Sequence, residues 1–179
     1  IFSCTLPAAN RFNLSGNTLT TGSVRGILIS GGETVNVYRN TISGISADAN
    51  TTGTVNGIWI TGGLAVIIER NKIFDISSTS EVMSGAGTVQ GIQVSGSTAN
   101  SNVSIINNII GNLRTPVMSS TTALRGVSLI STGLTSAINI YYNTIYLNST
   151  STKIDFGSTG IYHTASATTS TATLDMRNN

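Results

Sequence analysis

The chain has 179 residues and a formal net charge of +2 at pH 7, with 9% charged and 39% hydrophobic residues. Because an average globular domain carries about 25% charged residues, small polar side chains must supply most of the polarity. The hydrophobic fraction is too high for a disordered chain, and no apolar run approaches the roughly 20 residues of a membrane helix. The small, dispersed positive charge argues against a nucleic-acid partner, and the length fits one domain over residues 1–179.

A repeated first segment sets the predicted architecture. It consists of a glycine followed by an apolar, a variable and an apolar residue, which is the alternation of a short strand with one buried face. The glycines recur 31 to 35 residues apart. The five copies occupy residues 24–29, 55–60, 89–94, 124–129 and 158–163.

A second apolar segment and an asparagine follow each first segment. Three residues after each second segment stands an asparagine, and in all but the last copy another apolar residue follows two positions later. The second segments occupy residues 35–37, 66–68, 103–105, 138–140 and 174–176, with an earlier copy at 12–14. The asparagines are Asn17, Asn40, Asn71, Asn108, Asn143 and Asn179.

The constant order of these segments predicts the fold. A unit of 31 to 35 residues cannot bury its own apolar face, so neighbouring units must stack. We therefore expect an all-β, right-handed parallel β-helix of about five coils with three parallel sheets. A tight corner favours a residue that tolerates left-handed backbone angles, and stacked amides can hydrogen-bond along a column. The six asparagines are thus expected to form a structural ladder at a corner, not a binding site.

The repeat from Phe12 to Asn179 resembles the parallel β-helix repeat of the pectate-lyase-like superfamily. The resemblance implies the fold but leaves function open, because the superfamily includes lyases, hydrolases, epimerases, phage tailspikes, adhesins and surface proteins. The segment 143–147, which reads Asn-Thr-Ile-Tyr-Leu, is similar to repeats of long secreted bacterial surface proteins.

The acidic residues do not form a catalytic pattern. Inverting hydrolysis needs two carboxyl groups about 6.5–9.5 Å apart, yet only Asp48 and Glu81 are expected in loops of neighbouring coils, and Asp75 is expected to stand alone. His163, the single histidine, falls in an inward column at the last coil. We expect no catalytic residue, no metal and no cofactor. A polysaccharide lyase or glycoside hydrolase is the alternative, which a calcium site at Asp48 and Glu81 would favour.

An outward column of the first segments contains two aromatic residues. Trp59 and Tyr162 stand three coils apart in it, with small or polar residues between them. Either ring could stack on a sugar, so a carbohydrate-binding domain is a second alternative. The loops that follow the third strands, at 46–54, 77–88 and 114–123 among others, are where recognition would lie on a rigid scaffold.

The beginning of the sequence continues the repeat pattern at the point where the end of the sequence interrupts it. Residues 1–11 read as the third strand that would follow Asn179, and residues 12–179 as the stacked coils. One hypothesis is head-to-tail stacking of subunits, a contact that does not close and generates filaments. The other is that the sequence is a window from a longer β-helix. Under the first hypothesis the interface would contain Ile1, Phe2, Leu174, Met176 and Asn179.

These patterns together favour a non-enzymatic structural or adhesive protein. The resemblance to secreted repeat proteins implies an extracellular or cell-surface location, in the manner of an adhesin. We expect a homo-oligomer that assembles end to end into a filament or surface fibre, with cell-surface glycans as the other candidate partner and without insertion into a membrane.

Overall fold

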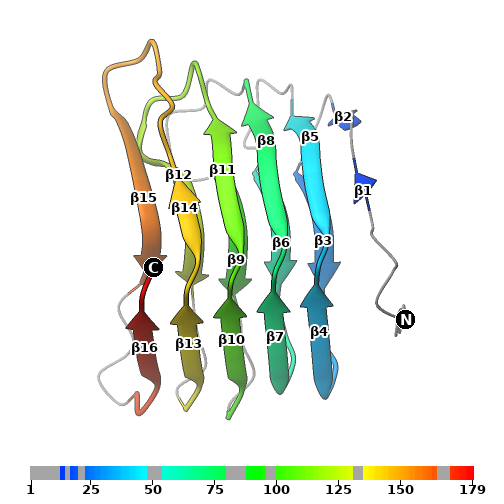
Figure 1. Cartoon of the computed structure of the whole chain (residues 1–179). Helices are drawn as coiled ribbons and strands as arrows, with labels where there is room; N and C mark the ends of the chain where they lie inside the picture. The colour runs from blue at the N-terminus through cyan, green and yellow to red at the C-terminus, as the bar shows by residue number, and fades with distance from the viewer. Residues whose placement is uncertain are drawn as a thin grey trace.

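The computed structural model describes residues 13–14, 17–19, 23–47, 54–79, 88–95, 100–130, 135–164 and 170–179. Every regular element within these ranges is a β-strand. The strands form three parallel sheets that wind as a solenoid (Figure 1). The all-β parallel fold predicted from the repeats is therefore confirmed.

The three sheets are numbered in the order in which each repeat enters them. The first sheet contains β3 (Val24–Ile29), β6 (Val55–Ile60), β9 (Val89–Ser95), β12 (Ser120–Ile130) and β15 (Phe156–His163). The second contains β4 (Thr34–Tyr38), β7 (Ala65–Glu69), β10 (Asn102–Ile106), β13 (Ala137–Tyr141) and β16 (Thr173–Arg177). The third contains β1 (Asn13–Leu14), β2 (Asn17–Leu19), β5 (Thr41–Ala47), β8 (Lys72–Ser78), β11 (Ile109–Arg114) and β14 (Thr144–Tyr146).

Strands of successive repeats are neighbours in every sheet. Within the described residues, four complete turns lead from β3 through β6, β9 and β12 to β15, and β16 continues the winding. The solenoid thus has about four turns, where the repeat count predicted about five. Register is constant along the stack, since Ile73 of β8 lies beside Ile42 on one side and Ile110 on the other.

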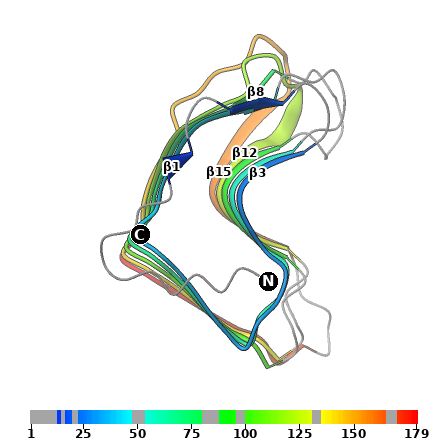
Figure 2. The same cartoon turned by 90° about the vertical axis from the view of Figure 1, so that its right-hand side faces the viewer.

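The core is a set of isoleucine and valine columns enclosed by the three sheets (Figure 2). Ile42, Ile73 and Ile110 of the third sheet are fully buried, as are Ile68 and Ile105 of the second. Burying one such side chain stabilises the fold by about 1.5–3 kcal/mol. Because each coil shares its apolar surface with the next, this stabilisation exists only in the stack.

The glycine column lies where the first sheet bends towards the core. A Cβ atom at Gly57 would be 2.5 Å from Cγ2 of Ile73 and 2.6 Å from the carbonyl oxygen of Gly91. The same two contacts recur at Gly91 and Gly126. Figure 2 shows that the strands of this sheet, among them β3, β12 and β15, curve inward. Glycine is therefore required by close packing against the isoleucine column of the third sheet.

The asparagine ladder is confirmed from Asn40 to Asn179, but it does not occupy the left-handed position. Asn71 donates its backbone N–H and its side-chain Nδ2 to Oδ1 of Asn108, at 3.0 and 2.9 Å. The exposed residue before each ladder asparagine takes the positive φ instead, so that the asparagine amide can point along the stack. These residues are Arg39 (φ 56°), Arg70 (54°), Asn107 (55°), Tyr142 (57°) and Asn178 (54°).

The prediction for the first position of the asparagine ladder, Asn17, was wrong. Asn13 and Leu14 pair with Thr41 and Ile42, and Asn17 pairs with Ile45, so β1 and β2 both lie in the third sheet. Residues 12–14 were expected in the second sheet, with Asn17 stacked on Asn40. The reason lies in β5, which Gly44 bends with a φ of 65° into two short halves; β1 pairs with one half and β2 with the other. The prediction for residues 1–11 lies outside the described residues.

Candidate functional site

Three successive strands of the third sheet, β5, β8 and β11, each contain a bend. Gly44 (φ 65°), Asp75 (54°) and Asn112 (48°) hold the left-handed conformation at equivalent positions of β5, β8 and β11. Glycine, asparagine and aspartate are the residues that adopt it most readily. The Asn112 amide donates to the Asp75 carboxylate of the preceding coil. Asp75, which was expected to stand alone, is therefore part of the bend.

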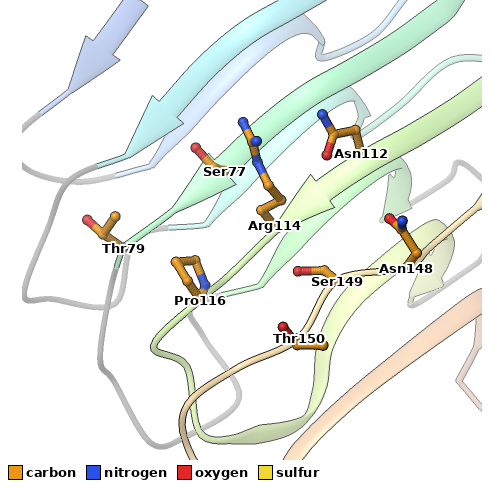
Figure 3. Close-up of a pocket in the computed structure, with 8 residues that line it drawn as sticks. All are labelled: Ser77, Thr79, Asn112, Arg114, Pro116, Asn148, Ser149 and Thr150. Carbon is orange, nitrogen blue, oxygen red and sulfur yellow. The ribbon is translucent and has the colours of Figure 1, made fainter.

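Beyond this bend the strand ends line a cavity with a volume of about 540 Å³. Its walls come from the end of β8, from β11 and from the segment after β14 (Figure 3). In Figure 3 Arg114 lies between Ser77 and Asn112, and the 148–150 segment faces them. The lining residues are Ser77, Thr79, Asn112, Arg114, Pro116, Asn148, Ser149 and Thr150.

Hydrogen bonds between coils hold the two walls of this cavity together. The backbone N–H of Thr152 donates to the carbonyl oxygen of Pro116 at 2.9 Å. The hydroxyl of Ser151 donates to the carbonyl oxygen of Met118 at 2.8 Å, and the Met118 side chain is buried beneath. The segment after β14 is thereby fixed to the segment after β11, although neither is a regular strand at that point.

The chemistry of the cavity is polar and singly charged. Its side chains offer hydroxyl and amide groups, which both donate and accept hydrogen bonds, and one guanidinium, which only donates. Among the described residues the ion pair joins Arg177 to Asp175, and exposed Arg114 takes no part in one. The described lining residues include no carboxylate and no histidine. The arrangement suits binding.

The predicted sugar-stacking residues lie in another place, on the first sheet. Their column is confirmed, because Trp59 pairs with Gln93, and Ser128 pairs with both Gln93 and Tyr162. The Arg25 guanidinium lies 4.1 Å from the centre of the Trp59 ring. Trp59 Nε1 also donates to the Ser95 hydroxyl at 2.6 Å. One face of the indole is therefore covered, and its N–H has a partner.

Tyr162 has a similar environment at the other end of the column. The Arg125 guanidinium lies 3.8 Å from the centre of its ring. Arg125 is itself buried, and burial lowers the pKa of its guanidinium. Only the face of the Tyr162 ring that points away from the stack is left for a sugar. A glycan contact at Trp59 and Tyr162 stays a prediction.

A row of buried polar side chains beside this column was not foreseen. Asn56, Gln90 and Arg125 occupy equivalent positions on three successive coils, and each is at most 7% exposed. Asn56 Nδ2 and Oδ1, Gln90 Oε1 and Arg125 Nε have no partner among the described residues. The first sheet curves inward (Figure 2), and the Arg125 guanidinium of this row packs on the Tyr162 ring.

The residues weighed for catalysis do not assemble into a site. Asp48 and Glu81, with the calcium site they would have made, lie outside the described residues. His163 pairs with Leu129 as predicted, and it is exposed because β15 is the last described strand of its sheet. No group of three His, Cys, Asp or Glu side chains within the described ranges could hold a metal ion.

The predicted assembly residues are only partly described. Ile1 and Phe2 lie outside the described residues. Leu174 and Met176 project from β16, the outermost strand of the second sheet, and Met176 is 50% exposed. Asn179 accepts hydrogen bonds on Oδ1 from the backbone N–H and the Nδ2 of Asn143, at 3.1 and 2.9 Å.

Protein-family models, curated proteins and solved structures all give no match to this chain. The parallel β-solenoid is shown by the structure itself, and membership of the pectate-lyase-like superfamily stays a prediction. Within the described ranges there is no helix with the length and apolar character needed to cross a membrane.

Proposed function

We propose that this protein is a non-enzymatic adhesive β-solenoid of the cell surface, which binds glycans in the cavity lined by Arg114. The observation that carries the proposal is a guanidinium without an ion-pair partner among the described residues, set in a hollow of hydroxyl and amide groups. Such groups match the alternating donors and acceptors of a sugar. A guanidinium adds a strong hydrogen bond to a sugar oxygen or to an acidic substituent.

The scaffold supports binding with little loss of entropy. The walls of the cavity belong to stacked coils. Backbone pairing of β8 with β11 joins these coils, and so do the hydrogen bonds to the carbonyl oxygens of Pro116 and Met118. A ligand would therefore meet a largely formed site, and a formed site avoids part of the cost of ordering side chains on binding. The described lining residues include no carboxylate or histidine that could act as an acid–base pair, which favours adhesion over turnover.

The test is a binding screen against neutral and acidic oligosaccharides, followed by titration calorimetry on any that bind. A charge-assisted hydrogen bond contributes about 1.5–3 kcal/mol, so Arg114→Gln should weaken binding about tenfold or more. Arg39→Gln is the matched control, because Arg39 is also exposed but lies at the ladder corner. Absence of binding to every glycan, or equal affinities of the two variants, would contradict the proposal.

A second candidate function is end-to-end assembly into a fibre. It is supported by the outer edge of β14, β15 and β16, which have no neighbouring strand on that side among the described residues. Half-exposed Met176 lies on this edge. The ladder also runs in one direction, since each coil donates to Oδ1 of the next. That polarity favours head-to-tail contact over a symmetric dimer.

Electron microscopy and sedimentation velocity of the 179-residue chain would test assembly. Continuous stacking predicts filaments with a repeat of about 4.8 Å per coil along the axis. Met176→Lys should abolish them, and Leu64→Lys should not, because Leu64 is 45% exposed but directly precedes β7, which is three strands away from β16 in the second sheet. Monomers of the unmodified chain at high concentration would rule assembly out.

A further inference from the structure

The outer face of the third sheet contains a gap between two aromatic residues. Phe74 of β8, Gly111 of β11 and Tyr146 of β14 occupy one column, each paired with the next. Their sequence neighbours Ile73, Ile110 and Ile145 pack into the core, so alternation turns this column outward. Tyr146 is 62% exposed. The column thus presents an aromatic residue, a position without a side chain and a second aromatic residue.

The size of the gap suits one flat ring. Neighbouring coils lie about 4.8 Å apart, so positions two coils apart are separated by roughly 9.6 Å. A ring placed midway would lie about 4.8 Å from each neighbour, within the 4.5–7 Å at which ring centres stack. A bulky side chain at position 111 would fill this space.

Packing within the protein does not demand glycine at this position. A Cβ atom on Gly111 would lie 3.6 Å from the carbonyl oxygen of Tyr146 and 3.9 Å from its Cβ, which are ordinary contacts. At Gly57 and Gly91 the corresponding contacts are 2.5 and 2.6 Å. The backbone of Gly111 also does not have a positive φ, so its conformation does not require glycine. Glycine at position 111 therefore affects the shape of the outer surface, where it leaves room between Phe74 and Tyr146.

The gap adjoins the cavity described above. Gly111 immediately precedes Asn112, and Tyr146 stands two residues before Asn148, both of which line the cavity. Resting on the proposed function, we infer that Phe74 and Tyr146 sandwich one pyranose ring of the bound glycan over Gly111. The neighbouring sugar then reaches the hydroxyl, amide and guanidinium groups around Arg114. The site would select cyclic sugars with an apolar ring face over acyclic polyols.

Saturation-transfer NMR on the whole chain tests this placement, with cellohexaose, a hyaluronan hexasaccharide and sorbitol as probes. Irradiating the aromatic protons should transfer magnetisation to ring C–H protons of a bound hexasaccharide and not to sorbitol. Gly111→Leu and Tyr146→Ala should each remove the transfer and weaken binding about tenfold. Tyr142→Ala is the matched control, because Tyr142 is 57% exposed but lies at the ladder corner.

The outcomes separate the inference from the function on which it rests. If a hexasaccharide binds in an Arg114-dependent way but Gly111→Leu and Tyr146→Ala bind it equally well, the sandwich is wrong and the glycan site stands. If neither hexasaccharide binds and the broader screen is negative, both are wrong. If sorbitol binds as well as the hexasaccharides, or if a tryptophan-containing peptide binds in their place, the assignment to a pyranose ring is overturned. Thermal unfolding curves of each variant verify that it folds.

Discussion

Asn108 donates both its backbone N–H and its side-chain Nδ2 to Oδ1 of Asn143, at 3.0 and 2.9 Å. The same Nδ2 donates to the carbonyl oxygen of Ile68 at 2.9 Å, and Oδ1 of Asn108 accepts the equivalent pair of bonds from Asn71. Each interior amide therefore satisfies groups on the coils before and after it. The ladder replaces water at a corner where Asn71 and Asn108 are fully buried.

Replacing Asn108 by alanine should destabilise the fold strongly. The change removes the Asn108 side-chain partner of the Ile68 carbonyl oxygen and of the Asn71 backbone N–H, and it takes one of two acceptors from the Asn71 Nδ2. Each buried polar group left without a partner costs about 1–3 kcal/mol. We expect a loss of roughly 3–5 kcal/mol in the free energy of unfolding by urea. Asn102→Ala is the control, because exposed Asn102 only accepts a 3.3 Å bond from Asn139. Similar losses in the two variants would mean that the ladder contributes little.

Adding one methyl group at Gly91 should be nearly as damaging. Its Cβ would meet Cγ2 of Ile110 at 2.5 Å and the carbonyl oxygen of Gly126 at 2.6 Å. Overpacking of this kind costs about 1–3 kcal/mol or more, which thermal unfolding would detect. Gly31→Ala has nothing within 4 Å of its Cβ and should be neutral or slightly stabilising. A neutral Gly91→Ala would show that the bend of the first sheet is soft.

Glycine at position 142 should have the opposite effect. Tyr142 is exposed and has a φ of 57°, a conformation that costs a residue with a Cβ atom about 1–2 kcal/mol. After the greater chain entropy of glycine is subtracted, Tyr142→Gly should stabilise the fold by about 0.5–1 kcal/mol. Thr144→Gly, in the adjoining strand β14, should destabilise it by a similar amount. Equal destabilisation in the two variants would argue against strain at the corner.

The sequence was sufficient to predict the parallel stack and most of the ladder. Each copy repeats the same inward residues, so an ambiguous position in one copy can be assigned by comparison with the other copies. The columns through Ile73 and Asn71 follow from this comparison. The prediction was wrong at Asn17, where a single copy had no neighbour to check it. Register there depends on the bend of β5 at Gly44, which is a tertiary feature.

The candidate site could not be predicted in the same way. Arg114 and Asn148 belong to different coils, and they meet only because irregular segments are tied to each other through Pro116 and Met118. One signal was available, namely the interruption of an aromatic column by Gly111. The burial of Asn56 was likewise not predicted, because the curvature of the first sheet is a tertiary feature that a local repeat does not encode.

Stability should fall at both ends of the pH range because of one surface cluster. Asp175 accepts bonds from Arg177 at 2.9 and 2.7 Å and from the Tyr141 hydroxyl at 2.9 Å. The bond from Arg177 lowers the pKa of Asp175, so its stabilisation is present above the unfolded pKa and is lost as pH falls through the folded one. The bond to Asp175 raises the pKa of Tyr141, so that stabilisation is lost as pH rises through the folded pKa of Tyr141.

Melting temperatures of the unmodified chain and of Asp175→Asn across pH would reveal this cluster. The difference between the two proteins should be largest between the two titrations and should shrink below about pH 4 and above about pH 10, the ordinary ranges of aspartate and tyrosine. Asp155→Asn is the control, since Asp155 is exposed and forms no ion pair with a described residue. A difference that does not change with pH would contradict the assignment.

Chemical-shift mapping by NMR tests the glycan-binding site most directly. Any oligosaccharide that binds should be titrated into the isotopically labelled chain, with the side-chain amides of Asn112 and Asn148 as reporters. The account predicts that perturbations centre on these amides, on Arg114 and on Tyr146, with little change at Trp59. Perturbations that centre on Trp59 and Tyr162 would instead place the ligand on the first sheet and contradict the site proposed on the third.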